Sequence, residues 1–270
     1  MKKNHDEKVA LHKKIIEHEQ AGKREVEEQR GMVVVKANSL IQKSRYELSL
    51  QEQRIILYLI SKIKPDDTEL KEMELSIQDF SEICGLDYTS GSNAYVYVKK
   101  TIKSLADKSE WISFDNNSET LVRWIDTAKI EKGKGIVKVG LSKTLMPYLL
   151  ELKKQYTSYQ LLNILPMTSK YSIRLYELLK SYSNLGHKRF NTDELKIRLG
   201  AETYKDITNF KNRVLFPALK DIEQYGDIKV SLIVIKEKNK IVGFEFIISP
   251  LEDIDERMEK WENISEQIGG

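Results

Sequence analysis

The sequence has little cysteine or proline and no long apolar run. Its 270 residues include one cysteine and five prolines, and no apolar stretch approaches the ~20 residues that a membrane span needs. Cys84 has no second cysteine to pair with, which is typical of proteins in a reducing compartment. The opening stretch, MKKNHDEKVALHKK, lacks the continuous apolar core of a secretory signal. We therefore expect a cytoplasmic protein with no membrane partner.

Motifs of catalysis are also missing. His5, His12 and His18 lie in a weakly patterned segment and His187 stands alone, so no His-x-His pair can hold the metal that a DNA-cutting tyrosine requires. No GxxxxGK[ST] loop is present to bind ATP phosphates. Cys84 has apolar helical neighbours and fits a core position better than a nucleophile. The sequence predicts a protein that is not an enzyme and needs no cofactor or metal.

The formal net charge of +3 conceals a strong segregation of charge along the chain. Residues 156–250 hold 15 Lys and Arg against 10 Asp and Glu, whereas residues 251–270 hold 2 against 7. A basic segment followed by an acidic one indicates a surface for a polyanion with a separate appendage. Ordinary solvated surface charge is the alternative reading.

The first patterned unit follows a polar arm over residues 1–31, which has few apolar positions. MVVVKANSLI predicts a strand, and Ser49 with Glu52 forms a capping box that opens a helix over SLQEQRIILYLISKI. LSIQDFSEICGL predicts a short helix, and AYVYVKKTIKSLADKS predicts a third helix. Strands over WISFDN, TLVRWIDTAKI and IVKVGLS follow, with the turn EKGKG before the last one.

The same order then recurs. SKYSIRLYELLKSYSNLG predicts a helix ending at Gly186, and FNTDELKIRLG predicts a short helix between an Asn191 cap and a Gly200 exit. DITNFKNRVLFPALKDIEQYG predicts a longer helix ending at Gly226, and IKVSLIVIKEKNKIVGFEFIIS predicts a hairpin. Three helices followed by a hairpin are typical of the winged helix-turn-helix. The predicted fold is α+β, with two tandem winged-helix domains.

The predicted boundaries divide the chain into four parts. They are an arm at 1–31, a first winged-helix domain at 32–153, a second at 154–250 and an acidic amphipathic helix at 251–270. Leu145, Leu149 and Leu152 have helical spacing and predict a helical connector between the domains. The acidic helix, predicted to start at Ser249 and Pro250, has three possible roles: it packs on its own domain, docks a host replication protein, or covers the basic face.

The third helix of the second unit is the strongest candidate site. At about 100° per residue, one face is apolar and would pack on the short helix at 192–199; it carries Ile207, Phe210, Val214, Ala218 and Ile222. The opposite face and the helix entrance carry Lys205, Asn209, Asn212, Arg213, Phe216 and Lys220. The hairpin tip, KEKNK, adds Lys236, Lys238 and Lys240. Arg and Asn can bond purine edges in the DNA major groove while lysines contact phosphates, so double-stranded DNA is the expected partner.

Two points stay open from the residues alone. Pro217 removes one backbone bond from a helix interior, so that helix either kinks or breaks and restarts there. The first unit repeats the basic pattern more weakly, since residues 33–155 hold 19 Lys and Arg against 17 Asp and Glu. Its candidates are Lys99, Lys100, Lys103, Lys132 and Lys134. This unit either contacts DNA phosphates or serves mainly for protein contacts, including dimerisation.

Three stretches over roughly residues 33–250 carry a family resemblance: LSLQEQRIILYLISKI, SKYSIRLYELLKSY and FKNRVLFPALKDI. In order and spacing they resemble the plasmid replication initiators of the Rep_3 (initiator RepB-type) family. The resemblance implies two winged-helix domains, binding to repeated origin DNA and origin opening with host helicase loading. It also implies repression of the protein's own promoter by a dimer. It places base reading at Asn209, Asn212, Arg213 and the neighbouring lysines, although some relatives have a denser arginine cluster than KNR.

The implied partners are therefore origin repeats, a second copy of the chain, and host replication proteins such as a helicase or host initiator. Two other functions fit the same residues. One is a winged-helix transcriptional regulator without a role at an origin. The other is a scaffold whose winged helices bind proteins instead of DNA.

Overall fold

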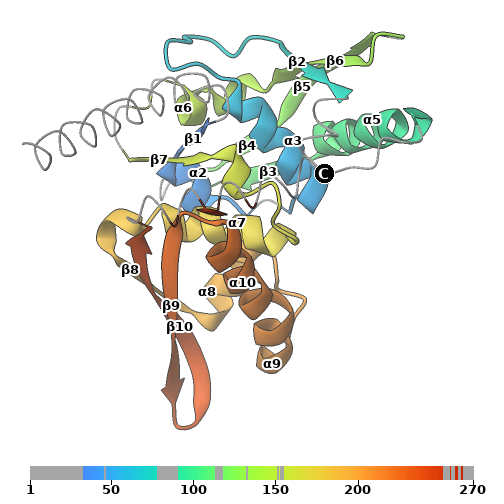
Figure 1. The fold of residues 1–270 in the computed structure, drawn as a ribbon. Coiled ribbons are helices and arrows are strands. Elements are labelled where there is room, and N and C mark those ends of the chain that lie inside the picture. Colours follow the sequence, from blue (N-terminus) through green and yellow to red (C-terminus); the bar gives the residue numbers. More distant parts are fainter. Residues whose placement is uncertain are drawn as a thin grey trace, which may run out of the picture.

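Two units of mixed helix and sheet make up the structure (Figure 1). The computed structural model describes residues 33–45, 47–77, 91–112, 118–131, 133–150, 152, 155–251, 256, 259–260 and 263. The predicted arm at 1–31, most of the predicted short helix that contains Cys84, and Lys132 lie outside the described residues.

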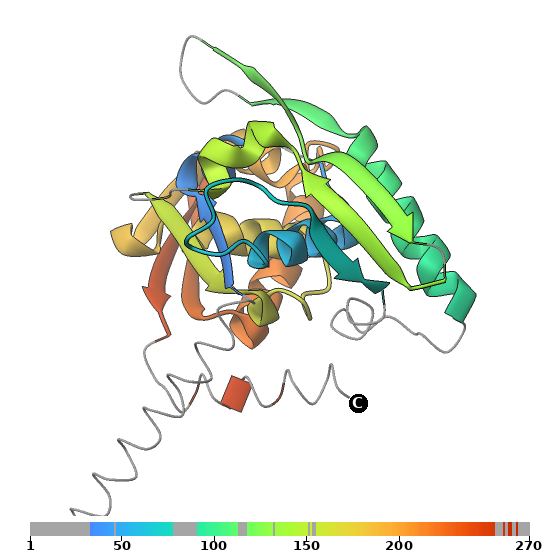
Figure 2. The same ribbon diagram turned by 90° about the horizontal axis from the view of Figure 1, so that it is seen from above.

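The first unit contains a helix pair on a three-stranded sheet. Its described elements are α3 (Leu50–Ser61), β2 (Met73–Ser76), α5 (Gly91–Asp107), β3 (Ser109–Ile112), β4 (Thr120–Arg123), β5 (Ile125–Glu131) and β6 (Ile136–Leu141). The predicted capping box is confirmed, because the Glu52 amide donates to Ser49 Oγ over 3.3 Å and the Ser49 amide donates to Glu52 Oε2 over 2.6 Å. The predicted apolar face of α5, Val98, Ile102 and Leu105, is buried beside the sheet (Figure 2).

The second unit repeats this plan. Its elements are α7 (Lys170–Lys180), β8 (His187–Asn191), α8 (Thr192–Leu199), α9 (Ile207–Phe210), the π-helical turn η5 (Lys211–Leu215), α10 (Phe216–Tyr225), β9 (Ile228–Glu237) and β10 (Lys240–Pro250). Its antiparallel sheet has the order β8-β10-β9, and the first unit has the matching order β2-β6-β5. The predicted duplication is therefore seen in the strand topology, and the two-stranded β3–β4 hairpin is an addition to the first unit.

The predicted helical connector between the units is wrong beyond Leu149. A 3-10 turn η2 (Lys143–Leu145) and the short α6 (Met146–Leu149) are followed by a strand, β7 (Tyr156–Gln160). This strand pairs antiparallel with β1 (Val33–Ala37), so that a partner more than a hundred residues away decides its conformation. Its burial alternates, with Thr157 and Tyr159 inside, which is the period of a strand rather than of a helix. A 3-10 turn η3 (Leu161–Asn163) then leads to the second unit.

Some predicted boundaries also shift. The strand at 33–37 gives way to a helix, α2 (Asn38–Lys43), and α7 ends at Lys180, before a 3-10 turn, η4 (Ser183–Leu185), and Gly186 in the left-handed region. The strands β2 and β8 were not predicted, because each is only four or five residues long and lacks a clear alternation of apolar residues. Ser249 and Pro250 belong to β10, where they pair with the start of β9, and therefore do not begin a helix.

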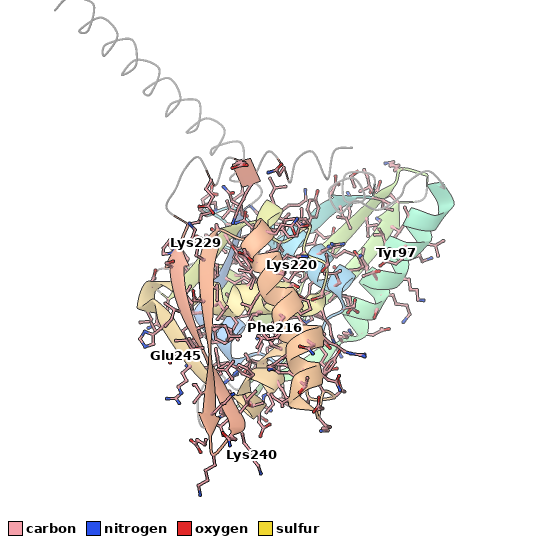
Figure 3. All side chains as sticks on the ribbon, turned by 60° about the horizontal axis from the view of Figure 1, so that its bottom comes forward. Tyr97, Phe216, Lys220, Lys229, Lys240 and Glu245 are labelled. Carbon is pink, nitrogen blue, oxygen red and sulfur yellow. The ribbon has the colours of Figure 1, made fainter. Side chains whose placement is uncertain are left out.

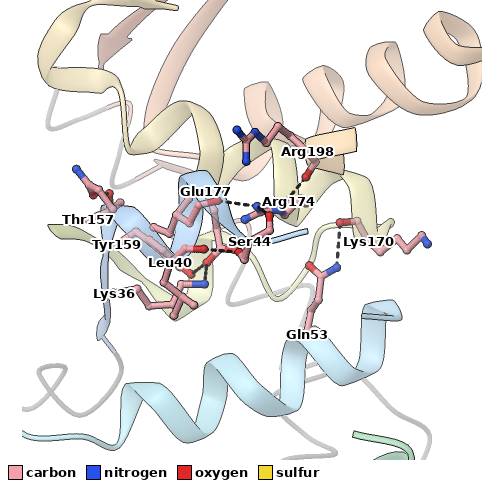
Figure 4. A network of polar contacts seen from close by, with 12 residues as sticks. Lys36, Leu40, Ser44, Gln53, Thr157, Tyr159, Lys170, Arg174, Glu177 and Arg198 are labelled. Carbon is pink, nitrogen blue, oxygen red and sulfur yellow. Dashed lines mark hydrogen bonds and ion pairs between the residues drawn. The ribbon is translucent and has the colours of Figure 1, made fainter. Parts of the chain in front are cut away.

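A buried polar network joins the two units across α7 (Figure 4). Arg174 is 2 % exposed, and its Nη2 donates to the carbonyls of Ile41 and Ser44 over 2.6 and 2.8 Å. Its Nε donates to the Arg198 carbonyl over 3.0 Å. Removing a charged guanidinium that donates to three buried carbonyls is costly. Because these carbonyls come from both units, α7 is a core helix that the two units share.

A second buried pair lies one turn further along α7. Lys36 of β1 forms an ion pair with Glu177, and the Tyr159 hydroxyl of β7 donates to the same carboxylate. Burial raises the pKa of Glu177, but the charges of Lys36 and Arg174 and the hydrogen bonds outweigh it, so the pKa lies below its ordinary value. The carboxylate is held ionised at the junction of the two units.

Candidate nucleic-acid interface

The helix-turn-helix of the second unit is built by local signals. Asn191 Oδ1 accepts from the Glu194 amide over 2.7 Å at the start of α8, as predicted. Gly200 ends α8 with a φ of +62°, a conformation that other residues rarely adopt. Asp206 Oδ1 then accepts from the Asn209 amide over 2.7 Å and opens α9. The turn between these caps sets the angle at which the third helix leaves the short one.

The inner face of the third helix is anchored in the core. Phe210, Val214, Ala218 and Ile222 are buried, as predicted, and Ile207 is half-buried. The predicted packing on the short helix is wrong for α10, which packs chiefly on α7 and on β9. The short helix α8 instead reaches the start of the third helix, where Lys196 Nζ lies 5.6 Å from the Phe210 ring centroid. The helix α7 contacts both α8 and α10 and provides most of the surface on which α10 packs.

The far end of the third helix is also tied to α7 and to the residues just before it. Asp221 accepts from the Thr168 amide and hydroxyl over 2.8 and 2.9 Å. Just beyond α10, Asp227 accepts from the Tyr176 hydroxyl over 2.8 Å and pairs with Lys180 over 2.6 Å. Burial and the charge of Asp227 raise the pKa of Tyr176 well above its ordinary value, so the hydroxyl stays a donor. These contacts hold the exposed face in one orientation.

The outer face of the third helix carries the predicted polar set. Asn209, Asn212, Arg213 and Lys220 are exposed, and Lys205 is exposed at the entrance. Among the described residues, the side chains of Asn212, Arg213 and Lys220 have no hydrogen-bond or ion-pair partner. Phe216 is 45 % exposed on the same helix. Cationic and amide groups without internal partners, beside an exposed ring, form a surface suited to an anionic polymer.

Lys211 belongs to this face, although its helical spacing did not mark it. The π-helical turn brings Lys211 Nζ to 5.7 Å from the Phe216 ring centroid, a cation–π arrangement between residues five apart. Pro217 left open whether the helix kinks or breaks there. In the structure the helix continues through a widened turn just before Pro217 and does not break.

The hairpin tip lies beside the same surface. Lys238 and Asn239 both have positive φ, which closes the tight turn between β9 and β10. Lys236, Lys238 and Lys240 are exposed and make no ion pair within the described part of the chain. Figure 3 places Lys240 at the end of the hairpin that runs alongside the helix carrying Phe216 and Lys220. A bulge at Gly243, where a Cβ would lie 2.6 Å from the Phe190 carbonyl oxygen, shapes the strand behind the tip.

The first unit offers a partly neutralised copy. Lys99 and Lys100 are exposed on α5, but Lys103 pairs with Asp107 over 2.6 Å. Lys134, in the turn between β5 and β6, pairs with Glu131 over 2.9 Å. Exposed pairs of this kind are weak, so both lysines can still exchange a carboxylate for a phosphate. These contacts are compatible with a DNA surface and with a protein surface alike.

The described residues of the acidic segment contact the second unit. Lys260 Nζ donates to the carbonyls of Glu223 and Gly226 over 2.7 and 3.4 Å, at the end of α10. Glu256 pairs with Lys229 of β9 over 2.8 Å. Glu256 and Lys260 line a groove of about 460 Å³ between α10 and β9, which Phe216 and Lys220 also line. The expectation that this segment packs on its own domain agrees with these contacts.

Neither a metal cluster nor a membrane helix is found in the described residues. They contain no group of three or more His, Cys, Asp or Glu side chains placed to bind a metal ion. None of the helices in the described part of the chain combines the length and apolarity needed to cross a bilayer.

The fold agrees with comparisons to known proteins. The family model described as "Initiator Replication protein, WH1" matches residues 33–180, and the model described as "Initiator Rep protein, WH2" matches residues 191–248. The chain belongs to the Rep3 family of plasmid replication initiators. Both winged-helix domains of the Rep3 family are thus present in the order that the repeat predicted.

Individual Rep3-like relatives are similar over part of their length. A replication initiation protein of Escherichia coli is 29% identical over 210 residues, which are 74% of this chain and 64% of that protein. The PI protein of Escherichia coli is 31% identical over 149 residues, 47% of this chain and 48% of that protein. A crystal structure of the Pi initiator protein in complex with iteron DNA superposes with a TM-score of 0.64 at 23% identity. It covers 83% of this chain and 99% of that chain, a likeness that shows the shared fold.

Proposed function

We propose that this protein is a plasmid replication initiator that binds repeated origin DNA as its first step. The observation that carries the proposal is the outer face of the third helix in the second domain. There, Asn212, Arg213 and Lys220 are exposed without internal partners among the described residues, beside a lysine-rich hairpin tip. The family to which the chain belongs and the iteron DNA bound by the Pi initiator protein support the same reading.

The proposed roles follow from geometry and chemistry. Asn209, Asn212 and Arg213 read base edges in the major groove, because amide and guanidinium groups make paired hydrogen bonds with purines. Lys205 and Lys220 contact the flanking phosphates. Lys236, Lys238 and Lys240 contact phosphates beside the same groove. Phe216 packs against the sugar or a thymine methyl group, which removes its exposed ring from water.

The first domain has a lesser role in DNA binding in this proposal. Lys99, Lys100 and Lys103 on α5, with Lys132 and Lys134, add phosphate contacts that do not select sequence. Tyr97 on α5 and the labelled residues of the third helix come into view from the same direction in Figure 3. Pairing with a second copy through the first domain, and repression of the protein's own promoter by that dimer, belong to the same proposal.

Origin opening and loading of a host helicase are the later steps that membership of the family suggests. They require host replication proteins as partners, with the cytoplasm as the site of action. The protein itself acts by binding and needs no catalytic group, cofactor or metal in this scheme.

One experiment tests the proposed function directly. A circular DNA bearing the protein's own origin repeats is introduced into cells that supply the protein from elsewhere. Maintenance of the circle only when the protein is present is the expected result. If the protein binds the repeats but the circle is lost, the chain is a transcriptional regulator. If it binds no duplex DNA at low salt, the protein is a scaffold.

A further inference from the structure

The third helix of the second domain contains one widened turn, which holds about one residue more than a turn of α-helix. Between α9 and α10, the Phe216 amide donates to the Lys211 carbonyl, five residues earlier, and residues Lys211–Leu215 form a π-helical turn. Such single turns arise when a residue is accommodated inside an otherwise regular helix, and they occur often at functional sites.

The extra residue narrows the arc around the helix axis over which the apolar face is spread. In a straight helix at about 100° per residue, Ile222 would lie about 120° around the axis from Phe210. Phe210, Val214, Ala218 and Ile222 are nevertheless all buried to within 1 % exposure on one side of the molecule. The widened turn takes back roughly one residue of rotation, which returns the second half of the helix to the core.

Pro217 also favours the widened turn. A proline has no amide hydrogen, and in an α-helix its ring crowds the carbonyl of the residue four positions earlier, here Arg213. Widening the turn just before the proline separates these groups. Pro217 accordingly follows the widened turn directly, as the second residue of α10.

Two residues of the widened turn face outward without hydrogen-bond or ion-pair partners among the described residues. Asn212 and Arg213 occupy its middle, and both are exposed. We propose that the π-helical turn is the specificity-determining element of the DNA interface, with Pro217 as its positioning residue. The extra residue pushes Asn212 and Arg213 out from the helix toward the base edges while Phe216 and Lys220 turn toward the groove beside β9. This inference rests on the proposed DNA binding of the second domain.

The test compares two variants that differ only in the length of the turn. The shortened variant lacks Lys211 and carries Pro217→Ala, so that the helix can run straight with Phe210, Leu215, Ala218 and Ile222 inside. The length-matched control carries Lys211→Ala and Pro217→Ala, which removes the same charge and the same proline but keeps the extra residue. Affinity for the cognate repeat and for scrambled duplex is measured for both, together with circular dichroism.

The shortened variant is expected to lose cognate affinity at least tenfold relative to the length-matched control, while the two bind scrambled duplex within about threefold of each other. Equal preference for the cognate repeat in both variants would overturn the inference. A wild-type protein without any cognate preference would instead refute the proposed function, so the two failures are distinguishable.

A second measurement does not depend on the folding of the shortened chain. A photo-crosslinking residue replaces Asn212 in the otherwise unchanged protein, and in a control replaces the exposed Gln224, about 18 Å further along the helix at 1.5 Å per residue. Crosslinks from position 212 to bases of the repeat, and none from position 224, support the proposed role of the turn. Crosslinks from position 212 to the sugar-phosphate backbone alone would overturn it.

Discussion

Replacing Arg174 by methionine tests how much the buried network between the two domains contributes to the free energy of unfolding. The guanidinium donates to the carbonyls of Ile41 and Ser44 in the first domain and of Arg198 in the second. Methionine retains most of the apolar volume of the arginine stem but offers no donor. The change therefore removes the hydrogen bonds and leaves the space largely filled.

The size of the effect follows from burial. A hydrogen bond to a charged group contributes about 1.5–3 kcal/mol, and removing one partner from a buried ionic network costs about 3–5 kcal/mol. Three carbonyls lose their donor at once, and Glu177 loses one of the two positive charges that keep it ionised. Because such losses are not additive, we expect Arg174→Met to lower the free energy of unfolding by about 3–5 kcal/mol.

Urea unfolding followed by circular dichroism measures this loss. Arg189→Met provides the control, because Arg189 is exposed on β8 and makes no ion pair within the described residues. The control should change the free energy of unfolding by less than about 0.5 kcal/mol. A loss of less than about 1 kcal/mol for Arg174→Met would refute the reasoning, since it lies within the net contribution of a single ordinary hydrogen bond.

Three further predictions concern charge. Arg213→Ala should weaken binding to the cognate repeat by about 1–3 kcal/mol and relax the sequence preference at one base position. Lys236→Ala should weaken binding to all sequences alike and lower the slope of log affinity against log salt concentration by about one. Binding titrations on single-base variants of the repeat separate the two patterns. The pKa of Glu177 is lowered in the folded state, so its contribution to stability is present above the unfolded pKa of about 4.3 and is lost as pH falls through the folded pKa. In that pH range the free energy of unfolding should change with pH more steeply for the wild type than for Glu177→Gln. Equal slopes for the two proteins would contradict the assignment. Truncation after Leu251 removes a segment with 2 basic and 7 acidic residues and should raise DNA affinity severalfold at low salt; unchanged affinity would exclude a covering role.

Local signals explain most of what the sequence predicted. The caps at Ser49 and Asn191 and the left-handed exit at Gly200 depend on neighbours within four residues, so they are readable from a short stretch. The exposed face of the third helix was predictable for the same reason, because a helical period and a polar set are both local properties. The roles of these side chains toward DNA remain predictions.

Long-range pairing explains most of what the sequence did not reveal. The strand Tyr156–Gln160 has leucines before and after it and was predicted as part of a helical connector, yet its conformation is decided by the distant Val33–Ala37. The charges of Lys36, Arg174 and Glu177 look like ordinary solvated surface charge in the sequence until their partners are known. Pro217 allowed a kink or a break, and only the packing of Ala218 and Ile222 on the core selects a widened turn.

The pairing of β1 with β7 limits how such proteins can be divided or recombined. A cut between residues 153 and 154 would leave the second half with a strand, Tyr156–Gln160, whose hydrogen-bonding edge had lost its neighbour. An open edge of this kind invites association with other chains. A chimaera of two related initiators would therefore have to inherit Val33–Ala37 and Tyr156–Gln160 from the same parent, although most of one half of the protein lies between them.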